Sequence, residues 1–251
     1  MSVIVQSSLK NRLLRGMNSD DFAQISAQLE PIELKLRDTL VKPSQRLAHI
    51  IFPENCIASV VAITPAGRQS EVGIVGCEGM VDVCAINGTD SSPLDCFVQI
   101  PGRAHRLPLA SLQGLIELSP TFRTILARYA QSFLIQVSHT AMANATCTID
   151  ERLARWLLMS QDRVGGSEIV MTHEFLSVML GVRRAGVTIA LQDIERHGQV
   201  KARRGSITIT DRPGLERLAN EAYGGPEAEY QRLFGYDFRV FGTAESALVA
   251  A

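Results

Sequence analysis

The stretch MTHEFLSVMLGVRRAGVTIALQDIERHGQVKARR, residues 171–204, contains two short helical patterns separated by a glycine. Thr172 can cap the first helix, because a threonine hydroxyl accepts a hydrogen bond from an N–H group of the first turn. The apolar residues of this helix fall on one face: Phe175, Leu176, Met179 and Leu180. Gly181 follows, and glycine tolerates the left-handed backbone in which many helices end. The pattern therefore predicts a helix that ends at Gly181.

The second helical pattern follows directly and ends at the His197-Gly198 pair. Val187, Leu191 and Ile194 stand at positions i, i+4 and i+7, so one face of this helix is expected to be buried. Two short helices joined by a tight glycine turn are typical of a helix-turn-helix, whose second helix can enter the major groove of DNA. The candidate DNA contacts project from the opposite face or stand at the N-terminal end: Arg183, Arg184, Ala185, Thr188, Ile189 and Gln192.

A basic hairpin is predicted immediately after the second helix. Residues 199–209, QVKARRGSITI, contain two β-rich runs around a turn, which indicates the wing of a winged helix. Its basic side chains are Lys201, Arg203 and Arg204. Helix pairs of this kind occur in many proteins, and surface arginines are often merely solvated. Arginines at the start of the second helix, followed by a basic hairpin, nevertheless favour the binding of double-stranded DNA.

The overall composition limits the kind of DNA contact. The 251 residues suffice for one or two domains with a sizeable core, and 46% hydrophobic and 20% charged residues are ordinary for a globular protein. The net charge of −1 argues against a uniformly basic surface. Any contact with DNA is therefore expected to be local.

The sequence predicts a cytoplasmic protein without a membrane partner. Lys10, Arg12 and Arg15 interrupt the N-terminus before a long apolar run develops, so no secretory signal is indicated. No uninterrupted apolar segment is long enough to span a bilayer. The cysteines are odd in number and scattered, as expected of reduced thiols: Cys56, Cys77, Cys84, Cys96 and Cys147.

Residues 32–108 consist of short β-rich runs separated by turn residues. The runs are residues 48–52, 57–64, 71–75, 81–86 and 95–100. Short strands at regular intervals predict an antiparallel barrel or jelly roll. No glycine-rich phosphate loop of the P-loop or dinucleotide-binding kind interrupts them.

The longest helical pattern begins at Ser119-Pro120 and runs to about residue 147, with serine as the cap and proline at the first helical position. Its apolar stripe consists of Phe122, Leu126, Tyr129, Phe133 and Val137. Such a stripe could simply pack on the chain's own β domain. A long helix between a barrel and a DNA-binding unit can instead pair with its copy, and two helix-turn-helix units are normally needed to read a palindrome. We therefore predict a homodimer with these five residues at its interface.

These patterns divide an α+β chain into four parts. A β-roll sensor domain is expected over residues 1–118, a dimerisation helix over 119–147, a winged helix-turn-helix domain over 148–223 and a tail over 224–251. The tail is too rich in large apolar residues for a purely solvated segment: Tyr230, Leu233, Phe234, Tyr236 and Phe238. Packing of this tail on a domain or on a partner is one interpretation.

The order of these parts, up to about residue 223, resembles the Crp/Fnr family of bacterial transcription regulators. The resemblance is carried by IIFPENCIASVVAITPAGRQSEVGIVGCEGM (50–80), the long Pro120 helix, ERLARWLL (151–158) and MTHEFLSVMLGVRRAGVTIALQDIERHGQV (171–200). The last segment follows the family pattern T-x-x-x-[LIF]-[AGS]-x-x-[LIV]-G-x-x-R-x-x-[VI] residue by residue. The resemblance implies a cyclic-nucleotide-binding-like β-roll (a jelly roll), a dimerisation helix and a winged helix-turn-helix.

The resemblance also implies roles for single residues. Thr172 and His173 fall on positions that touch the DNA backbone, Arg184 on the arginine that reads guanine, and Arg183 on a neighbouring backbone contact. Many members carry a glutamate where this chain has Ala185, and Ile189 replaces a polar residue at the next outward position. The target DNA sequence is therefore expected to differ from those of the best-known members.

The expected effector site departs from the family pattern. Members that bind cyclic AMP hold its phosphate with an Arg-Ser pair after a GEL-type turn, whereas this turn reads VGCEG (75–79) and the later pair is Ser91-Ser92 or Ser92-Pro93. No lysine or arginine occurs from Gln69 through Gly102. A buried phosphate without a cation is poorly compensated. We therefore expect no cyclic nucleotide; a ligand of the β-roll, if there is one, is neutral, apolar or cationic.

No cofactor is predicted. Iron–sulfur members need a cluster of cysteines, usually N-terminal, and the first cysteine here is Cys56. The lone histidines His49, His105 and His139 are more often structural than haem ligands. No nucleophile–base pair, metal cluster or paired carboxylate at an informative spacing predicts an enzyme. The leading hypothesis is a DNA-binding transcription regulator with RNA polymerase as a candidate partner; the alternative is a small-ligand or cyclic-nucleotide sensor that acts through protein contacts.

Overall fold

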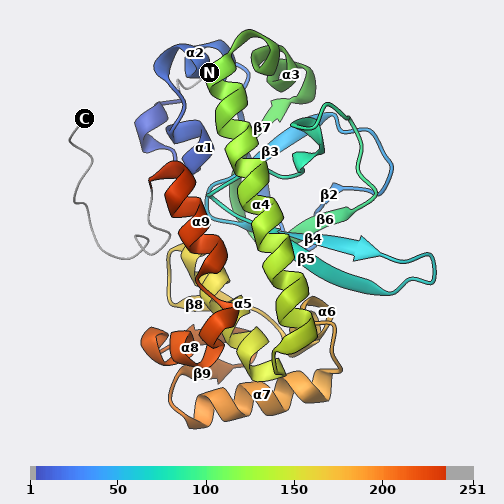
Figure 1. Cartoon of the computed structure of the whole chain (residues 1–251), viewed down its shortest axis with the longest axis vertical. Coiled ribbons are helices and arrows are strands. Elements are labelled where there is room, and N and C mark those ends of the chain that lie inside the picture. The colour runs from blue at the N-terminus through green and yellow to red at the C-terminus, as the bar shows by residue number, and fades with distance from the viewer. Residues whose placement is uncertain (1–3, 236–251) are drawn as a thin grey trace.

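A computed structural model describes residues 4–235 of the chain. An N-terminal β-roll and a C-terminal helical domain lie at the two ends of the molecule, and the long helix α4 (Pro120–Thr146) runs between them (Figure 1). The predicted α+β architecture of a β-roll, a long helix and a winged helix-turn-helix is confirmed. Among residues 4–235, no helix is both long enough and apolar enough to cross a membrane.

The β-roll consists of two antiparallel sheets, with strand orders β1-β7-β3 and β2-β6-β4-β5. Its strands are β1 (Glu30–Leu34), β2 (Thr39–Val41), β3 (His49–Pro53), β4 (Ile57–Ile63), β5 (Gln69–Val75), β6 (Asp95–Ile100) and β7 (Gly102–Pro108). Pairing of β1 with β7 and of β2 with β6 joins strands that are distant in sequence, as in a jelly roll. Val60 and Val98 are among the side chains buried between the sheets.

One expected strand is absent from the β-roll. Residues 81–86 form a turn and the short 3-10 helix η2 (Val83–Ala85) instead. Asp82 holds the turn with a positive φ of 69°, and its carboxylate accepts a hydrogen bond from the Cys84 N–H (2.9 Å). Val81 and Ala85 are nevertheless buried, so the apolar run fills the core as a turn. Its hydrophobicity did predict burial, but a short apolar run does not specify the backbone conformation.

Helices at the N-terminal end form a second core with the first half of α4. They are η1 (Gln6–Ser8), α1 (Arg12–Arg15), α2 (Ser19–Ser26) and α3 (Leu109–Leu118). Leu13 and Leu14 of α1 pack with Leu112 of α3 and with Phe122 of α4, and all four side chains are at most 1% exposed. The start of α4 is thereby fixed to its own β-roll.

The helix α4 begins and ends as predicted, and most of its apolar stripe packs within the chain. Ser119 caps it by accepting a hydrogen bond from the Phe122 N–H (3.1 Å). Of the five predicted dimer residues, four are buried within the chain and one, Val137, is half-buried: Phe122, Leu126, Tyr129, Phe133 and Val137. Packing within the chain accounts for the burial of these side chains, while Leu126, Phe133 and Val137 also line a groove on the open face of α4, so their place in a dimer interface stays a prediction. Periodicity shows that a stripe is buried but not against which surface.

The C-terminal domain contains α5 (Ile149–Val164), α6 (His173–Met179), α7 (Arg184–Arg196), α8 (Arg212–Ala219) and η3 (Asn220–Ala222). Its three-stranded sheet has the order β8-β10-β9, from Glu168–Val170, Ser206–Ile209 and Val200–Arg203. Trp156 and Leu157 of α5 belong to a core that continues into the β-roll through Ile57 and Ile74. The two domains therefore share one apolar interior.

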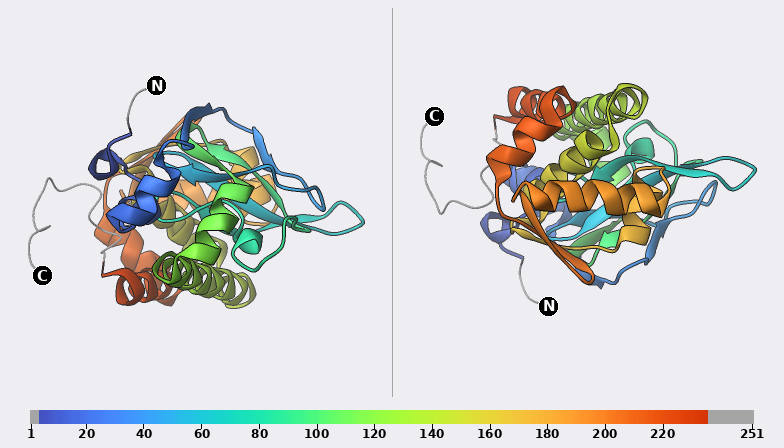
Figure 2. Two further views of the ribbon diagram at one scale, coloured as in Figure 1. Left: turned by 90° about the horizontal axis from the view of Figure 1, so that it is seen from above. Right: turned by 90° about the horizontal axis from the view of Figure 1, so that it is seen from below.

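A further helix, α9 (Gly225–Phe234), follows the DNA-binding domain and lies alongside α4 (Figures 1 and 2). Tyr230 is fully buried in it. This segment of the expected tail thus packs on the chain itself. Tyr236 and Phe238 lie outside the described residues.

Candidate nucleic-acid interface

The helix pair α6 and α7 is built as its sequence predicts. The Thr172 hydroxyl accepts a hydrogen bond from the Phe175 N–H (3.2 Å) and so caps α6. After Leu180, Gly181 takes a φ of 62°, and the chain turns into α7. Leu176 of α6 and Val187 of α7 are fully buried between the helices. The turn and the shared core fix the angle at which α7 leaves the domain.

The outward face of α7 lies at the lower end of the molecule, where the view from below shows the helix in front (Figure 2). Arg183, Arg184, Ala185 and Gln192 are exposed. Ile189 lies between them in the helix with 68% of its surface exposed. Single exposed apolar residues are common on protein surfaces. Here, however, the apolar side chain stands on the same face as the arginines at the N-terminal end of the helix, which suits the mixed polar and methyl surface of a major groove.

Thr188 is held more firmly than its neighbours. Its hydroxyl donates to the Arg184 carbonyl (3.1 Å). The Nδ1 atom of His173 lies 3.1 Å from the hydroxyl oxygen of Thr188. His173, which the family resemblance implies to be a backbone contact, therefore also touches the second helix. These contacts use the hydroxyl proton of Thr188 and hold its side chain in place, and the hydroxyl oxygen keeps a lone pair that can still accept a hydrogen bond.

The wing is a two-stranded hairpin attached to α7. β9 and β10 pair antiparallel with Arg203 opposite Ser206, and Gly205 takes a φ of 82° in the turn between them. Lys201, Arg203 and Arg204 are exposed. The Ala202 N–H donates to the Glu195 carboxylate of α7 (2.9 Å), which ties the wing to the helix. The exposed cations of α7 and of the wing thus belong to one rigid unit.

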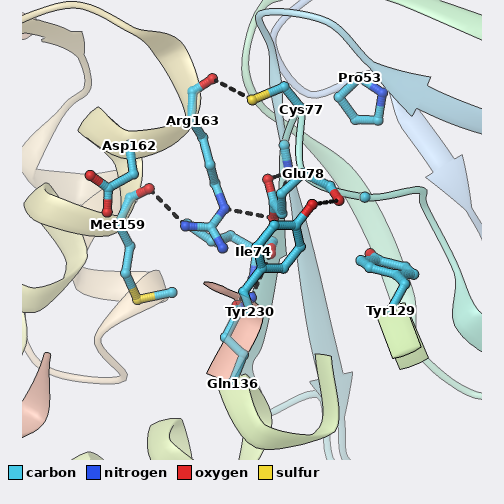
Figure 3. Close-up of polar contacts among 12 residues, drawn as sticks. Pro53, Ile74, Cys77, Glu78, Tyr129, Gln136, Met159, Asp162, Arg163 and Tyr230 are labelled. Carbon is cyan, nitrogen blue, oxygen red and sulfur yellow. Dashed lines mark hydrogen bonds and ion pairs between the residues drawn. The ribbon is translucent and has the colours of Figure 1, made fainter. Parts of the chain in front are cut away.

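A buried ion pair joins the DNA-binding domain to the β-roll. The Arg163 Nε atom of α5 donates to the Glu78 carboxylate at 2.8 Å, with side chains only 2% and 5% exposed (Figure 3). The Glu78 carboxylate also accepts from the Gly76 N–H, and the Arg163 Nη1 atom donates to the Met159 carbonyl (2.8 Å). Sequence reasoning missed this pair, because its members are 85 residues apart and neither belongs to a local motif.

A second buried carboxylate, Glu71, faces the same domain boundary. It accepts hydrogen bonds from Ser59 Oγ (2.5 Å) and Gln99 Nε2 (3.0 Å) of the β-roll and from Trp156 Nε1 of α5 (3.2 Å). Burial raises the pKa of Glu71 to about 7, although these donors favour the charged form. The Glu71 carboxylate therefore accepts hydrogen bonds from both domains. Its pKa of about 7 means that it changes protonation state near neutral pH.

The cysteines are dispersed over the chain as free thiols. Residues 4–235 contain no group of three or more His, Cys, Asp or Glu side chains placed to hold a metal ion. The five thiols are free, and burial raises the pKa of Cys56 and of Cys77 to about 12. Both thiols are consequently poor nucleophiles and poor metal ligands at neutral pH.

Comparison with known proteins bears on the domain that carries α6, α7 and the wing. Residues 151–218 match the model of the Crp-like helix-turn-helix domain. This segment of the chain is therefore similar to a Crp-like helix-turn-helix domain.

Solved structures share the fold over most of the chain. A putative Crp/Fnr-family transcriptional regulator from Eubacterium rectale is 20% identical with a TM-score of 0.61, covering 84% of this chain and 98% of that one. FixK2 from Bradyrhizobium japonicum is 14% identical with a TM-score of 0.66, covering 78% and 99%. A CRP-family regulator from Thermus thermophilus is 18% identical with a TM-score of 0.62, covering 78% and 99%. No curated protein matches the sequence significantly.

Proposed function

We propose that the protein is a sequence-specific transcription regulator that binds a palindromic operator as a homodimer, without a cyclic nucleotide. The observation that carries the proposal is the exposed face of α7, which presents Arg184 and Ile189 on a helix fixed to the wing. Such a helix enters the major groove with its N-terminal residues next to the bases. We place this activity in the cytoplasm, with RNA polymerase as a candidate partner.

Base recognition is assigned to the N-terminal half of α7. Arg184 is exposed and can donate two parallel hydrogen bonds to O6 and N7 of a guanine. Ala185 and Ile189 present apolar surface, which suits thymine methyl groups. Thr188 adjoins them with its side chain held by Arg184 and His173, and its methyl group suits the same thymine methyl groups. Each half-site is expected to contain a guanine flanked by thymines, and Gln192 lies further along the same face.

Contacts with the DNA backbone are assigned to the residues around α7. Thr172 and His173 stand at the start of α6, and Arg183 directly precedes α7. The wing side chains Lys201, Arg203 and Arg204 are exposed cations on the same rigid unit. Contacts with phosphates add affinity and fix the register of the helix, but they carry no base preference.

The dimer contact is assigned to the face of α4 that the β-roll and α9 leave open. A groove of about 560 Å³ runs along this face, and its apolar lining includes Ile86, Ile116, Leu126, Ala127, Ala130, Phe133, Leu134 and Val137. Leu134 is 57% exposed, and Met142 is 37% exposed two turns further along. The small alanines allow a second helix to approach closely, and its large apolar side chains can fill the groove. A second copy of α4 supplies such a surface in a symmetric dimer.

The interior of the β-roll is poorly suited to a cyclic nucleotide. Its cavity measures about 20 Å³, which accommodates roughly one water molecule. Most of its lining is apolar, including Val41, Val60 and Met80, and the charged side chain at its wall is the acidic Asp82. An anionic phosphate would meet a carboxylate there and no cation. We therefore propose that DNA binding does not depend on a cyclic nucleotide.

The proposal is tested by selecting bound fragments from a random DNA library with the purified full chain and no added nucleotide. We expect a saturable complex that excess competitor DNA does not erase, and an enriched motif with two inverted half-sites. A variant in which Arg183 and Arg184 are both alanine should enrich no motif, and Arg68→Ala, at an exposed arginine between β4 and β5, is the control. Failure of the wild-type chain to enrich any motif would overturn the proposed function.

A further inference from the structure

Four helices bond to one turn of the β-roll, residues 76–80, which we name the hub turn. The bonds run from Arg12 N of α1 to Cys77 O (2.7 Å), from Tyr129 Oη of α4 to Met80 O (2.8 Å), from Arg163 Nε of α5 to Glu78 Oε1 (2.8 Å) and from Tyr230 Oη of α9 to Glu78 O (2.9 Å). Figure 3 shows three of these side chains converging on the turn. The hub turn thereby links both domains, the long helix and α9.

Tyr230 is the residue through which α9 bonds to the hub turn. Its side chain is fully buried, and its hydroxyl donates to the Glu78 carbonyl. The Arg12 guanidinium lies 5.8 Å from the centre of the Tyr230 ring, and the Phe234 ring stacks on the same ring at 4.5 Å. Tyr230 therefore contacts the β-roll through its hydroxyl group and α1 through its ring.

The helix α9 also contacts α4 near both of its own ends. The Arg128 Nη1 atom of α4 donates to the Leu233 carbonyl (3.4 Å). At the other end, a Cβ atom on Gly225 would lie 2.4 Å from the His139 ring, so the close approach requires glycine. The two helices therefore lie side by side over several turns (Figure 1).

These contacts attach the DNA-binding domain at both of its ends. At its start, α4 and α5 are joined by only Cys147 and Thr148. At its end, the Tyr223 hydroxyl donates to the Asp162 carboxylate of α5 (2.6 Å), and α9 begins two residues later. The shared core and the Arg163–Glu78 pair already join this domain to the β-roll. The α9 contacts add a separate attachment to α4, so any rotation of the domain against α4 must break them as well.

We propose that α9 is a strap that fixes the angle between the DNA-binding domain and α4, with Tyr230 as its positioning residue. In a dimer joined through α4, this angle sets the distance between the two recognition helices. The strap therefore determines the spacing of the half-sites, whereas the exposed face of α7 determines their sequence. The effect on half-site spacing rests on the proposed function, whereas the fixed angle between the DNA-binding domain and α4 does not.

The first test measures the spacer preference of the full chain. Operators with identical half-sites differ by single base pairs in the spacer, each of which moves one half-site by about 3.4 Å and rotates it around the helix axis. We expect the wild type to prefer one spacer by about tenfold or more, and Tyr230→Ala to reduce this preference to about threefold or less. Base preference within each half-site should not change. The matched control is Arg232→Ala, an exposed residue of the same helix, which should keep the wild-type preference.

The second test needs no DNA. Amide hydrogen exchange of the free protein should become faster in Tyr230→Ala at residues 148–152 and in the hub turn, and should remain unchanged in Arg232→Ala. Tyr230→Phe keeps the ring and removes only the bond to Glu78, so a smaller change in both tests is expected; this variant decides the matter if Tyr230→Ala does not fold.

The two tests separate failure of the strap from failure of the proposed function. An unchanged spacer preference, or unchanged exchange at residues 148–152, would overturn the strap even if DNA binding is normal. If the wild type forms no specific complex, the proposed function fails and the exchange measurement alone decides the strap.

Discussion

The hub turn and α7 differ in where their charged side chains lie and in whether those side chains have partners within the protein. At the hub turn, Glu78 and Arg163 are almost fully buried and neutralise each other. On α7, Arg184 is exposed, and Arg183 beside it caps the helix without a side-chain hydrogen bond. Buried charges without partners are costly, whereas exposed charges without protein partners cost little and remain available to a ligand. The comparison teaches that the first region holds the domains together and the second is available for DNA.

The largest expected effect follows from breaking the buried pair. Arg163→Ala leaves Glu78 buried without its partner and should destabilise the protein by about 3–5 kcal/mol in urea unfolding. The control is Arg196→Ala, which removes an exposed pair with Asp193 and should cost less than about 1 kcal/mol. Equal losses in the two variants would contradict the difference drawn between the regions.

The next effect concerns Glu71 and pH. Because burial raises its pKa from 4.5 to about 7, the folded protein holds this proton more tightly than the unfolded chain. The stabilisation is complete below about pH 4.5 and is lost as pH rises through 7, by at most about 3 kcal/mol. Asp162, with its pKa raised by burial to about 6, acts in the same direction. Glu71→Gln should therefore remove only its own part of the slope between pH 5 and 8; parallel curves for both proteins would refute this account.

A third prediction tests the face of α4 assigned to the dimer. Leu134→Asp places a charge in the proposed apolar contact and should weaken dimerisation by about 2 kcal/mol or more in sedimentation equilibrium. Arg123→Ala, at the rim of the same groove, is the control and should change little. A Leu134→Asp dimer of wild-type affinity would show that this face is not the interface.

The readout of a single base gives a smaller effect. Arg184→Ala should cost about 1–3 kcal/mol against the preferred base and relax the preference at that position only. The measurement is a competition binding assay with half-sites that carry each base in turn. An unchanged base preference at every position would mean that α7 docks differently.

The smallest effect is expected in the wing. Arg203→Ala removes at most one phosphate contact, so it should weaken binding to all sequences alike and reduce the slope of log K against log salt by roughly one. Titrations at several salt concentrations, with specific and random DNA, measure both quantities. A change in base preference would assign Arg203 to the bases instead.

The elements that could be predicted are those specified by neighbouring residues. Thr172, the 175–180 stripe and Gly181 define one helix and its end, and Val187, Leu191 and Ile194 define the next. Four of the five predicted strand runs, which became β3, β4, β5 and β6, and the wing hairpin also follow from local alternation and turn residues, whereas β1, β2, β7 and β8 were not among the predicted runs. The exposed candidates on α7 and the wing could be identified for the same reason, since the buried positions of a short amphipathic element leave the others outside.

The tertiary structure alone decided what each buried group faces. The apolar stripe of α4 could pack against any apolar surface. Only the fold shows that the β-roll and the N-terminal helices of the same chain cover most of it. Glu78 meets Arg163 across 85 residues, and Tyr230 meets the hub turn across 152, separations over which local periodicity carries no information. Hydrophobic patterns and helix caps act between near neighbours, whereas the choice of a distant partner depends on the shape and charge of the whole folded surface.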